Sequence, residues 1–249
     1  MTEPTPHPPE DGIALITGAN KGLGLETARQ LGARGLTVLL GARDSRRGTT
    51  AAALLAAEGL DAHPLLLDVT DPGCVKDAAA LIEVRYGRLD ILVNNAGITG
   101  AFTGPPSTAT AEHLHEVYAT NVFGVLTVTN AMLPLLRRSR AGRIVNVSST
   151  VGSLTLNADP DGGFGAYNLV TYQSSKTALN ALTLAYAREL LDTPIKVNAA
   201  NPGFTATDIN GHRGHQTPAQ GAATAVRLAL LGPDGPTGTS QDDTGPVPW

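Results

Sequence analysis

Tyr172 and Lys176 are the residues of this 249-residue chain whose types and spacing could do chemistry. They open an apolar-periodic run, and residues four positions apart lie on the same face of a helix. An isolated tyrosine has a pKa of about 10 and rarely exchanges protons at neutral pH. A fixed cation beside the phenol favours the phenolate and brings that pKa toward working pH. The pair therefore predicts a tyrosine acid–base group, provided that the other elements build a site around it.

The composition is that of one ordinary globular domain. Hydrophobic residues make up 42% and charged residues 16% of a chain long enough for one sizeable core. The net charge of −4 argues against nucleic acid or an anionic membrane as the main partner. No continuous apolar run approaches the ~20 residues of a membrane span. Cys74 is the only cysteine, so no intrachain disulfide can form, and we expect a cytoplasmic protein without a signal peptide.

A glycine-rich turn follows the first apolar strand, which we predict at residues 13–17. Gly18, Gly22 and Gly24 have the spacing G-x-x-x-G-x-G, and a helix opens directly after them. Glycines let the backbone approach a ligand closely, and a helix N-terminus offers free N–H groups to an anion. The turn predicts a cradle for the phosphates of a dinucleotide. A glycine-rich turn without a ligand is the alternative.

Basic residues follow the second predicted strand, at residues 36–42. In a dinucleotide-binding fold, an acid at this tip would bind the 2′-hydroxyl of the adenosine ribose. Here Arg43 comes first, with Arg46 and Arg47 one helical turn on, and guanidinium groups suit a 2′-phosphate. Lys21 in the glycine turn adds positive charge. NADP(H) is therefore favoured over NAD(H). Asp44 opposes this unless its carboxylate points away, and a solvated basic helix start is the alternative.

The remaining elements alternate between apolar strands and helices. Further strands are predicted at 64–68, 90–94, 142–149 and 195–201, with a short edge strand near 237–242. Helices are predicted at 45–60, 72–86, 111–136 and 218–230, besides the helix that carries Tyr172. Strands and helices in this order form a parallel sheet with helices on both faces. Such sheets bind ligands at the carboxyl ends of their strands.

Two polar features lie where this sheet would place a site. Asn121 sits inside an apolar stretch of the predicted helix 111–136, so it needs buried partners or a functional role. Ser148 and Ser149 end the fifth strand. Because neighbouring residues of a strand face opposite ways, only one of these two hydroxyls can point into the site.

These motifs together resemble the short-chain dehydrogenase/reductase family over residues 12–249. They occur in family order: Thr17-Gly18-x-x-x-Gly22-x-Gly24, Asp68, Asn94-Asn95-Ala96-Gly97, Asn121, Ser149, Tyr172-x-x-x-Lys176, and Pro202-Gly203 with Thr207. The resemblance implies a single-domain α/β Rossmann fold, a doubly wound, mostly parallel sheet of about seven strands. The Ala-Arg-Asp after the second strand, Lys21 and the Gly-Pro-Val-Pro-Trp ending look like those of NADPH-dependent carbonyl reductases. Residues 1–11, with four prolines, are expected to be a disordered leader.

The resemblance also implies residue roles. Tyr172 would protonate the substrate oxygen, Ser149 would hold that oxygen, and Lys176 would lower the Tyr172 pKa and bind the nicotinamide ribose. Asn121 would anchor a water chain. The implied cofactor residues are Gly18, Asn20, Lys21, Gly22, Leu23, Gly24, Arg43, Arg47, Asp68, Val69, Asn94, Ala96, Gly97, Lys176, Pro202, Gly203, Thr205 and Thr207. Separately from the resemblance, we predict a substrate pocket formed by the segments after Ser149 and after Gly203, comprising Thr150, Phe164, Tyr167 and Phe204.

One departure from the family is the spacing of Ser149 and Tyr172, which lie 23 positions apart, further than usual. We predict that the extra segment, residues 154–168, forms a lid that brings Phe164 or Tyr167 toward the ligand. A solvated surface loop is the alternative. The insertion could also obstruct the helix–helix dimer common in the family, so monomer, homodimer and homotetramer all stay open.

The sequence therefore predicts an NADPH-dependent oxidoreductase that reversibly reduces the carbonyl of a small ketone or aldehyde. Two other functions remain as alternatives: a catalytically idle NADP(H)-binding regulatory protein, and a nucleotide-sugar epimerase or dehydratase of related fold. No metal site is expected, because His212 and His215 share a loop without a nearby cysteine or carboxylate pattern.

Overall fold

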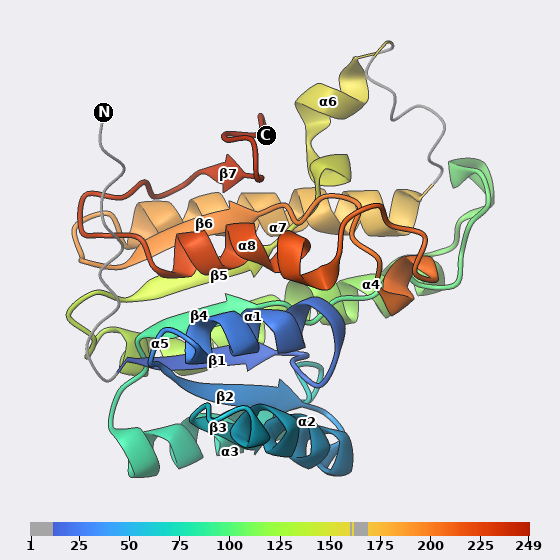
Figure 1. Ribbon diagram of the computed structural model, residues 1–249. Coiled ribbons are helices and arrows are strands. Elements are labelled where there is room, and N and C mark those ends of the chain that lie inside the picture. Colours follow the sequence, from blue (N-terminus) through green and yellow to red (C-terminus); the bar gives the residue numbers. More distant parts are fainter. Residues whose placement is uncertain (1–11, 160, 162–168) are drawn as a thin grey trace.

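Seven parallel strands form the central sheet of the computed structural model, in the order β3-β2-β1-β4-β5-β6-β7 (Figure 1). The strands are β1 (Ile13–Thr17), β2 (Thr37–Ala42), β3 (Ala62–Leu66), β4 (Ile91–Asn94), β5 (Arg143–Val147), β6 (Lys196–Ala200) and β7 (Ser240–Gln241). The structure describes residues 12–159, 161 and 169–249. The predicted leader, most of the insertion, and Phe164 and Tyr167 lie outside the described residues. The predicted doubly wound parallel sheet is confirmed.

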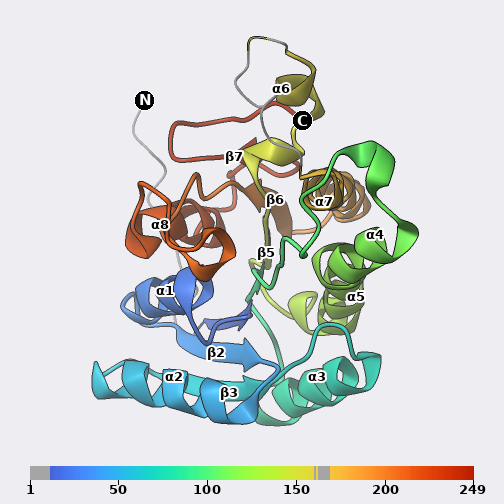
Figure 2. The same ribbon diagram turned by 90° about the vertical axis from the view of Figure 1, so that its right-hand side faces the viewer.

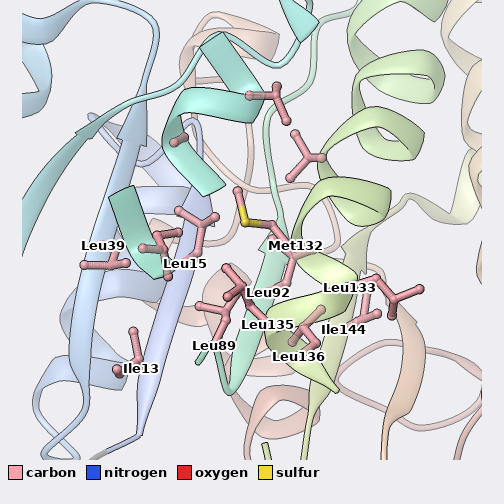
Figure 3. Close-up of a cluster of buried hydrophobic side chains, with 14 of the residues drawn as sticks. Ile13, Leu15, Leu39, Leu89, Leu92, Met132, Leu133, Leu135, Leu136 and Ile144 are labelled. Atoms are coloured by element: carbon pink, nitrogen blue, oxygen red, sulfur yellow. The ribbon is translucent and has the colours of Figure 1, made fainter. Parts of the chain in front are cut away.

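Helices cover both faces of the sheet (Figure 2). One layer contains α1 (Gly22–Gly32), α2 (Ser45–Ala57) and α8 (Pro218–Ala229), and the other contains α3 (Pro72–Tyr86), α5 (Val125–Leu136) and α7 (Val170–Glu189). Successive strand residues feed opposite cores, because side chains alternate across a sheet. Ile13 and Leu15 pack with α3 and α5 in the cluster of Figure 3, whereas Ala14 and Ile16 pack with α1, α2 and α8.

Helix boundaries follow local capping chemistry. Asp71 caps α3 by accepting from the backbone N–H groups of Gly73 and Cys74, with Pro72 at the first helical position. The second helix ends at Ala57, three residues earlier than predicted, and Gly59 then adopts a φ of +83°. The third strand begins at Ala62 rather than at residue 64, because its ladder with β2 starts at the Val38–Ala62 pair.

The predicted helix 111–136 is three segments: α4 (Ala111–Tyr118), a π-helical turn η2 (Ala119–Gly124) and α5. By length and composition this stretch could cross a membrane, with a mean hydropathy of 1.4 over its most apolar window. Polar residues interrupt the stretch, so it contains no continuous apolar run of membrane-spanning length. Half of that window is buried inside the fold, and Val128 and Met132 are fully buried core residues. Packing against the sheet therefore accounts for its apolar character.

Arg143, the first residue of β5, connects segments at the amino-terminal end of the parallel strands. Its side chain on β5 is 3% exposed, and burial lowers its pKa. The guanidinium donates to the backbone carbonyls of Gly142 (2.7 Å), Pro194 (3.1 Å), Leu231 (2.6 and 2.9 Å) and Gly232 (3.1 Å). One side chain thus joins β5 to the segments before β6 and after α8.

We expect Arg143→Met to lower the free energy of unfolding by about 2–4 kcal/mol, because carbonyls of three segments lose a buried donor. Urea denaturation measures this loss. Arg138→Met is the matched control, because Arg138 is an exposed arginine that contacts Gly87 and Glu83, and it should cost less than about 1 kcal/mol. Equal losses for the two variants would contradict this role for Arg143.

Candidate active site

The glycine-rich turn lies at the carboxyl end of β1, where its conformation admits little but glycine. Gly18 and Gly22 have φ values of +64° and +58°. A Cβ on Gly24 would lie 2.5 Å from Asn95 Nδ2 and 2.6 Å from the Gly18 carbonyl, too close for any side chain. Gly24 therefore lets the start of α1 pack closely against the turn after β1 and against Asn95 after β4.

Asn95 and Thr17 fix this turn to the end of β4, a role that the sequence patterns did not reveal. The Asn95 amide donates to the Thr17 carbonyl at 2.8 Å. Thr17 Oγ1 accepts from the backbone N–H groups of Asn95 (3.0 Å) and Ala96 (2.9 Å). Strand alternation is the signal that could have indicated it, since Asn94 and Asn95 must face opposite ways.

Asn94 is turned into the protein. Its side chain is 2% exposed and donates to Thr129 Oγ1 (3.1 Å) and Asn146 Oδ1 (2.9 Å). Any cofactor contact of Asn94 is therefore left to its backbone. Two other predicted cofactor residues also pack inward: Val69 is 9% exposed in the core, and Leu23 lies against Gly221 of α8.

The basic tip of β2 lies beside Asp68. The pKa of Asp68 is lowered, most by a hydrogen bond from the Thr70 hydroxyl, with burial opposing, and further by the Thr70 N–H and the charge of Arg43. Arg43 is exposed at the strand end, and Asp44 caps α2 by accepting from the Arg47 N–H at 2.9 Å. The Asp44 carboxylate is thus engaged by the N-terminus of α2.

Lys21 has a partner that the sequence did not predict. Its ammonium forms an ion pair with Asp208 of the short 3₁₀ helix η4 (Asp208–Asn210). The same loop carries Gly203, with a φ of +69°, and Thr205, whose hydroxyl donates to the Pro202 carbonyl. A Cβ on Gly22 would lie 3.7 Å from the methyl group of Thr207, so the two loops face one another.

The structure separates the two serines at the end of β5. Ser148 is 1% exposed and its hydroxyl donates to Asn180 Oδ1 at 2.6 Å, inside the protein. Ser149 is half-buried, and its side chain hydrogen-bonds the Tyr172 phenol. Ser149 rather than Ser148 therefore shares a site with Tyr172.

Tyr172 and Lys176 lie together near the start of α7. Lys176 Nζ is 5.5 Å from the centroid of the Tyr172 ring and donates to the Val147 carbonyl at 2.7 Å. Burial raises the pKa of Tyr172 to about 12, with the Ser149 hydrogen bond opposing, and burial lowers the pKa of Lys176 to about 8. The Tyr172 shift is opposite to the predicted one, because desolvation of the phenolate outweighs the hydrogen bond with Ser149.

Asn121 is fully buried in the π-helical turn η2. Its amide donates to the Ile98 carbonyl (2.9 Å) and Ser175 Oγ (3.0 Å), and its Oδ1 accepts from the Ile98 N–H (2.9 Å). Both amide hydrogens are used, so the side chain positions the 98 loop against α7. A Cβ on Gly97 would lie 3.4 Å from Asn121 Oδ1 and 3.6 Å from Lys176 Nζ, so the bare glycine keeps the space above both open.

The described base of the insertion joins both arms of the site to the last residue of the chain. After Ser149 come the 3₁₀ turn η3 (Thr150–Gly152) and the short helix α6 (Leu154–Ala158). Asn157 donates to the Val151 carbonyl (2.8 Å) and accepts from Gln173, next to Tyr172 (3.1 Å). Thr155 donates through its N–H and hydroxyl to the Trp249 backbone oxygen at 3.0 and 2.7 Å. Figure 2 shows α6 near this end of the chain.

Other predicted positions are placed as follows. Thr150 directly follows Ser149 in η3. Phe204 is 46% exposed, with its ring centroid 5.9 Å from that of His215. Within the described part of the chain, no three His, Cys, Asp or Glu side chains gather as a metal site would need.

A glycine-rich turn, a basic strand end and the half-buried Tyr172 thus lie at the carboxyl edge of a parallel sheet with a Rossmann-like fold. A family model described as short chain dehydrogenase matches residues 12–218, and the chain belongs to this family of oxidoreductases.

Relatives match it over nearly their whole length. Short-chain dehydrogenase/reductase 1 of Saponaria officinalis is 36% identical, over 96% of both chains. Carbonyl reductase [NADPH] 1 of Mus musculus is 34% identical, over 95% of this chain and 98% of its own. The crystal structure of an NADPH-bound carbonyl reductase from chicken fatty liver superposes with a TM-score of 0.83 at 27% identity, covering 96% of this chain and all of that one.

Proposed function

We propose that this protein is an NADPH-dependent reductase of a small ketone or aldehyde, reversible as an alcohol dehydrogenase. The observation that carries the proposal is the Ser149–Tyr172–Lys176 group at the glycine-rich sheet edge. The residues present fit the cofactor: the left-handed Gly18 and Gly22 lead into α1, whose first backbone N–H groups are capped by no side chain that the structure describes. The relatives named for NADPH support this cofactor.

The tyrosine would act as the proton donor. When bound, NADPH supplies a hydride to the carbonyl carbon. Ser149 would donate a hydrogen bond to the carbonyl oxygen as negative charge develops there. A pKa of about 12 keeps Tyr172 protonated at neutral pH, so its proton is ready for that oxygen.

Lys176 would stabilise the phenolate that this proton transfer leaves behind. Its pKa of about 8 keeps most of the amine protonated at pH 7, and the cation lies beside the ring. As charge appears on the phenol, attraction to the ammonium grows, so the pair stabilises the transition state more than the ground state. In the oxidation direction, Tyr172 must first lose its proton, so oxidation should need a higher pH than reduction.

Turnover against a panel of ketones, aldehydes and diketones, with NADPH and NADH, tests this function. We expect loss of NADPH absorbance and formation of an alcohol with at least one carbonyl class. Tight NADPH binding without turnover of any carbonyl would favour an idle binder. Conversion of a nucleotide sugar without net cofactor consumption would favour an epimerase or dehydratase.

Cofactor choice can be tested at the β2 tip. We expect Arg43→Ala to raise the dissociation constant of NADPH about 10- to 100-fold, because a charge-assisted contact to the 2′-phosphate is lost. The constant for NADH should change less than about threefold, because NADH lacks that phosphate. Calorimetric titration measures both, and Arg34→Ala, an exposed arginine at the end of α1, is the control. Equal weakening of both cofactors would contradict the assignment.

A further inference from the structure

Asp208 joins the loop after β6 to the glycine-rich turn after β1. One carboxylate oxygen pairs with Lys21 of the glycine turn, and the other accepts from His212 Nε2 at 2.8 Å. The pKa of Asp208 lies below its ordinary value, because its carboxylate accepts a hydrogen bond from Lys21 and is attracted by the Lys21 charge. The contact with His212 lowers the pKa further. The carboxylate is therefore an anion seated on the lysine that the family resemblance assigns to NADP(H).

The loop that carries Asp208 is shaped for this contact. His212 has a φ of +61°, a left-handed conformation shared by no other non-glycine residue that the structure describes. Its backbone N–H donates to the Thr207 carbonyl at 2.9 Å, and Asn210 donates through its amide to the Thr205 carbonyl at 2.8 Å. A strained backbone conformation at a non-glycine residue persists only where surrounding contacts stabilise it. The contact between His212 and Asp208 is one of these contacts.

We propose that Asp208 is a cofactor-specificity residue: it occupies Lys21 in the free protein and is displaced there by the 2′-phosphate of NADPH. The inference rests on the proposed NADPH dependence. Lys21 and Asp208 side chains are 59% and 53% exposed, so their ion pair is weak and can exchange. A phosphate monoester carries about −1.5 to −2 charges at pH 7 against −1 for a carboxylate, so it competes well for the ammonium.

His212 lowers the free-energy cost of moving Lys21 from Asp208 to the 2′-phosphate. When Lys21 turns to the phosphate, the Asp208 oxygen that faces His212 keeps its partner, so the loop retains its conformation. NADH has no 2′-phosphate and would leave the Lys21–Asp208 pair in place. Asp208 therefore opposes the binding of NADPH and not that of NADH, which sets the size of the preference between them.

Calorimetric titration of Asp208→Asn with NADPH, NADH, adenosine 2′,5′-bisphosphate and AMP tests the proposal. The two fragments isolate the 2′-phosphate from the nicotinamide half. We expect NADPH and the bisphosphate to bind about three- to fivefold more tightly, and NADH and AMP to change less than about twofold. In a Lys21→Met background the same substitution should change nothing, because the contested cation is gone.

Two controls separate the mechanism from general effects. Asp208→Glu keeps the charge and should bind like the wild type, whereas Asp192→Asn removes an exposed charge at the other end of the sheet and should not tighten NADPH. Equal tightening of all four ligands, no tightening of NADPH, or the same gain without Lys21 would overturn the proposal. If any of these is seen while the wild type still reduces carbonyls with NADPH, only this inference fails. A wild type that prefers neither cofactor would overturn the proposed function's choice of NADPH and this inference with it.

Discussion

Tyr172→Phe should lower kcat for carbonyl reduction by about 10²- to 10⁴-fold while NADPH affinity stays within about twofold of the wild type. The substitution removes only the hydroxyl that Ser149 contacts and keeps the ring beside Lys176. The proton donor is lost, whereas the glycine cradle and the β2 tip are untouched. Steady-state kinetics and NADPH titration of the same preparation measure the two effects.

Tyr186→Phe is the matched control for this prediction. Tyr186 is on the same helix, and its hydroxyl donates to Asn130 at 2.7 Å, away from the glycine-rich edge. Its loss should cost stability, with kcat changing less than about threefold. Near-normal turnover by Tyr172→Phe would remove Tyr172 from the role of proton donor.

Lys176→Met should lower kcat by about 10²-fold or more and yet stabilise the free protein at pH 7. Lys176 is 4% exposed and its pKa falls to about 8, so below pH 8 the folded protein carries a buried ammonium. A shift from the ordinary value of 10.5 corresponds to about 3 kcal/mol of destabilisation. Loss of the bond to Val147 offsets part of the gain, which leaves about 1–2 kcal/mol.

The stabilisation by Lys176→Met should depend on pH. Between pH 8 and 10.5 the unfolded chain still binds the lysine proton and the folded protein does not, so wild-type stability rises with pH there. Methionine does not titrate, so the free energy of unfolding that Lys176→Met gains over the wild type should be smaller at pH 9.5 than at pH 7. Urea denaturation at both pH values measures this, with the exposed Lys76→Met as control. A variant destabilised equally at both values would contradict the account.

Local patterns predicted most of the architecture. The alternation of apolar strands with helices, the Asp71 cap and the helix after Pro218 each depend on a few neighbouring residues, and the predicted strands were all found. Of the predicted helices, only the one at 111–136 is divided into segments. Strand alternation also restricted the site to one of two serines, and the contact between Ser149 and Tyr172 matches the choice made from the family resemblance. Features of this kind depend on neighbours in the sequence.

The features that were not predicted depend on distant partners or on burial. Lys21 and Asp208 are 187 positions apart, and no local pattern pairs them. Asn121, in the π-helical turn, hydrogen-bonds the backbone of Ile98 and the hydroxyl of Ser175, and these contacts are not visible in the sequence of its own helix. The sign of the Tyr172 pKa shift followed from desolvation, which only the folded structure supplies. The pairing of Tyr172 with Lys176 was predictable, whereas the effect of burial on the Tyr172 pKa was not.

Transfer of deuterium from [4-²H]NADPH to the product tests the central claim most directly. NADPH labelled on one or the other face of the nicotinamide is incubated with the protein and the carbonyl compound that turns over fastest, and the alcohol is analysed by mass spectrometry. We predict deuterium at the carbinol carbon from one of the two labelled forms, with product formation by Tyr172→Phe reduced in proportion to its kcat. An alcohol that carries no deuterium from either form would contradict direct hydride transfer, and with it the proposed reductase.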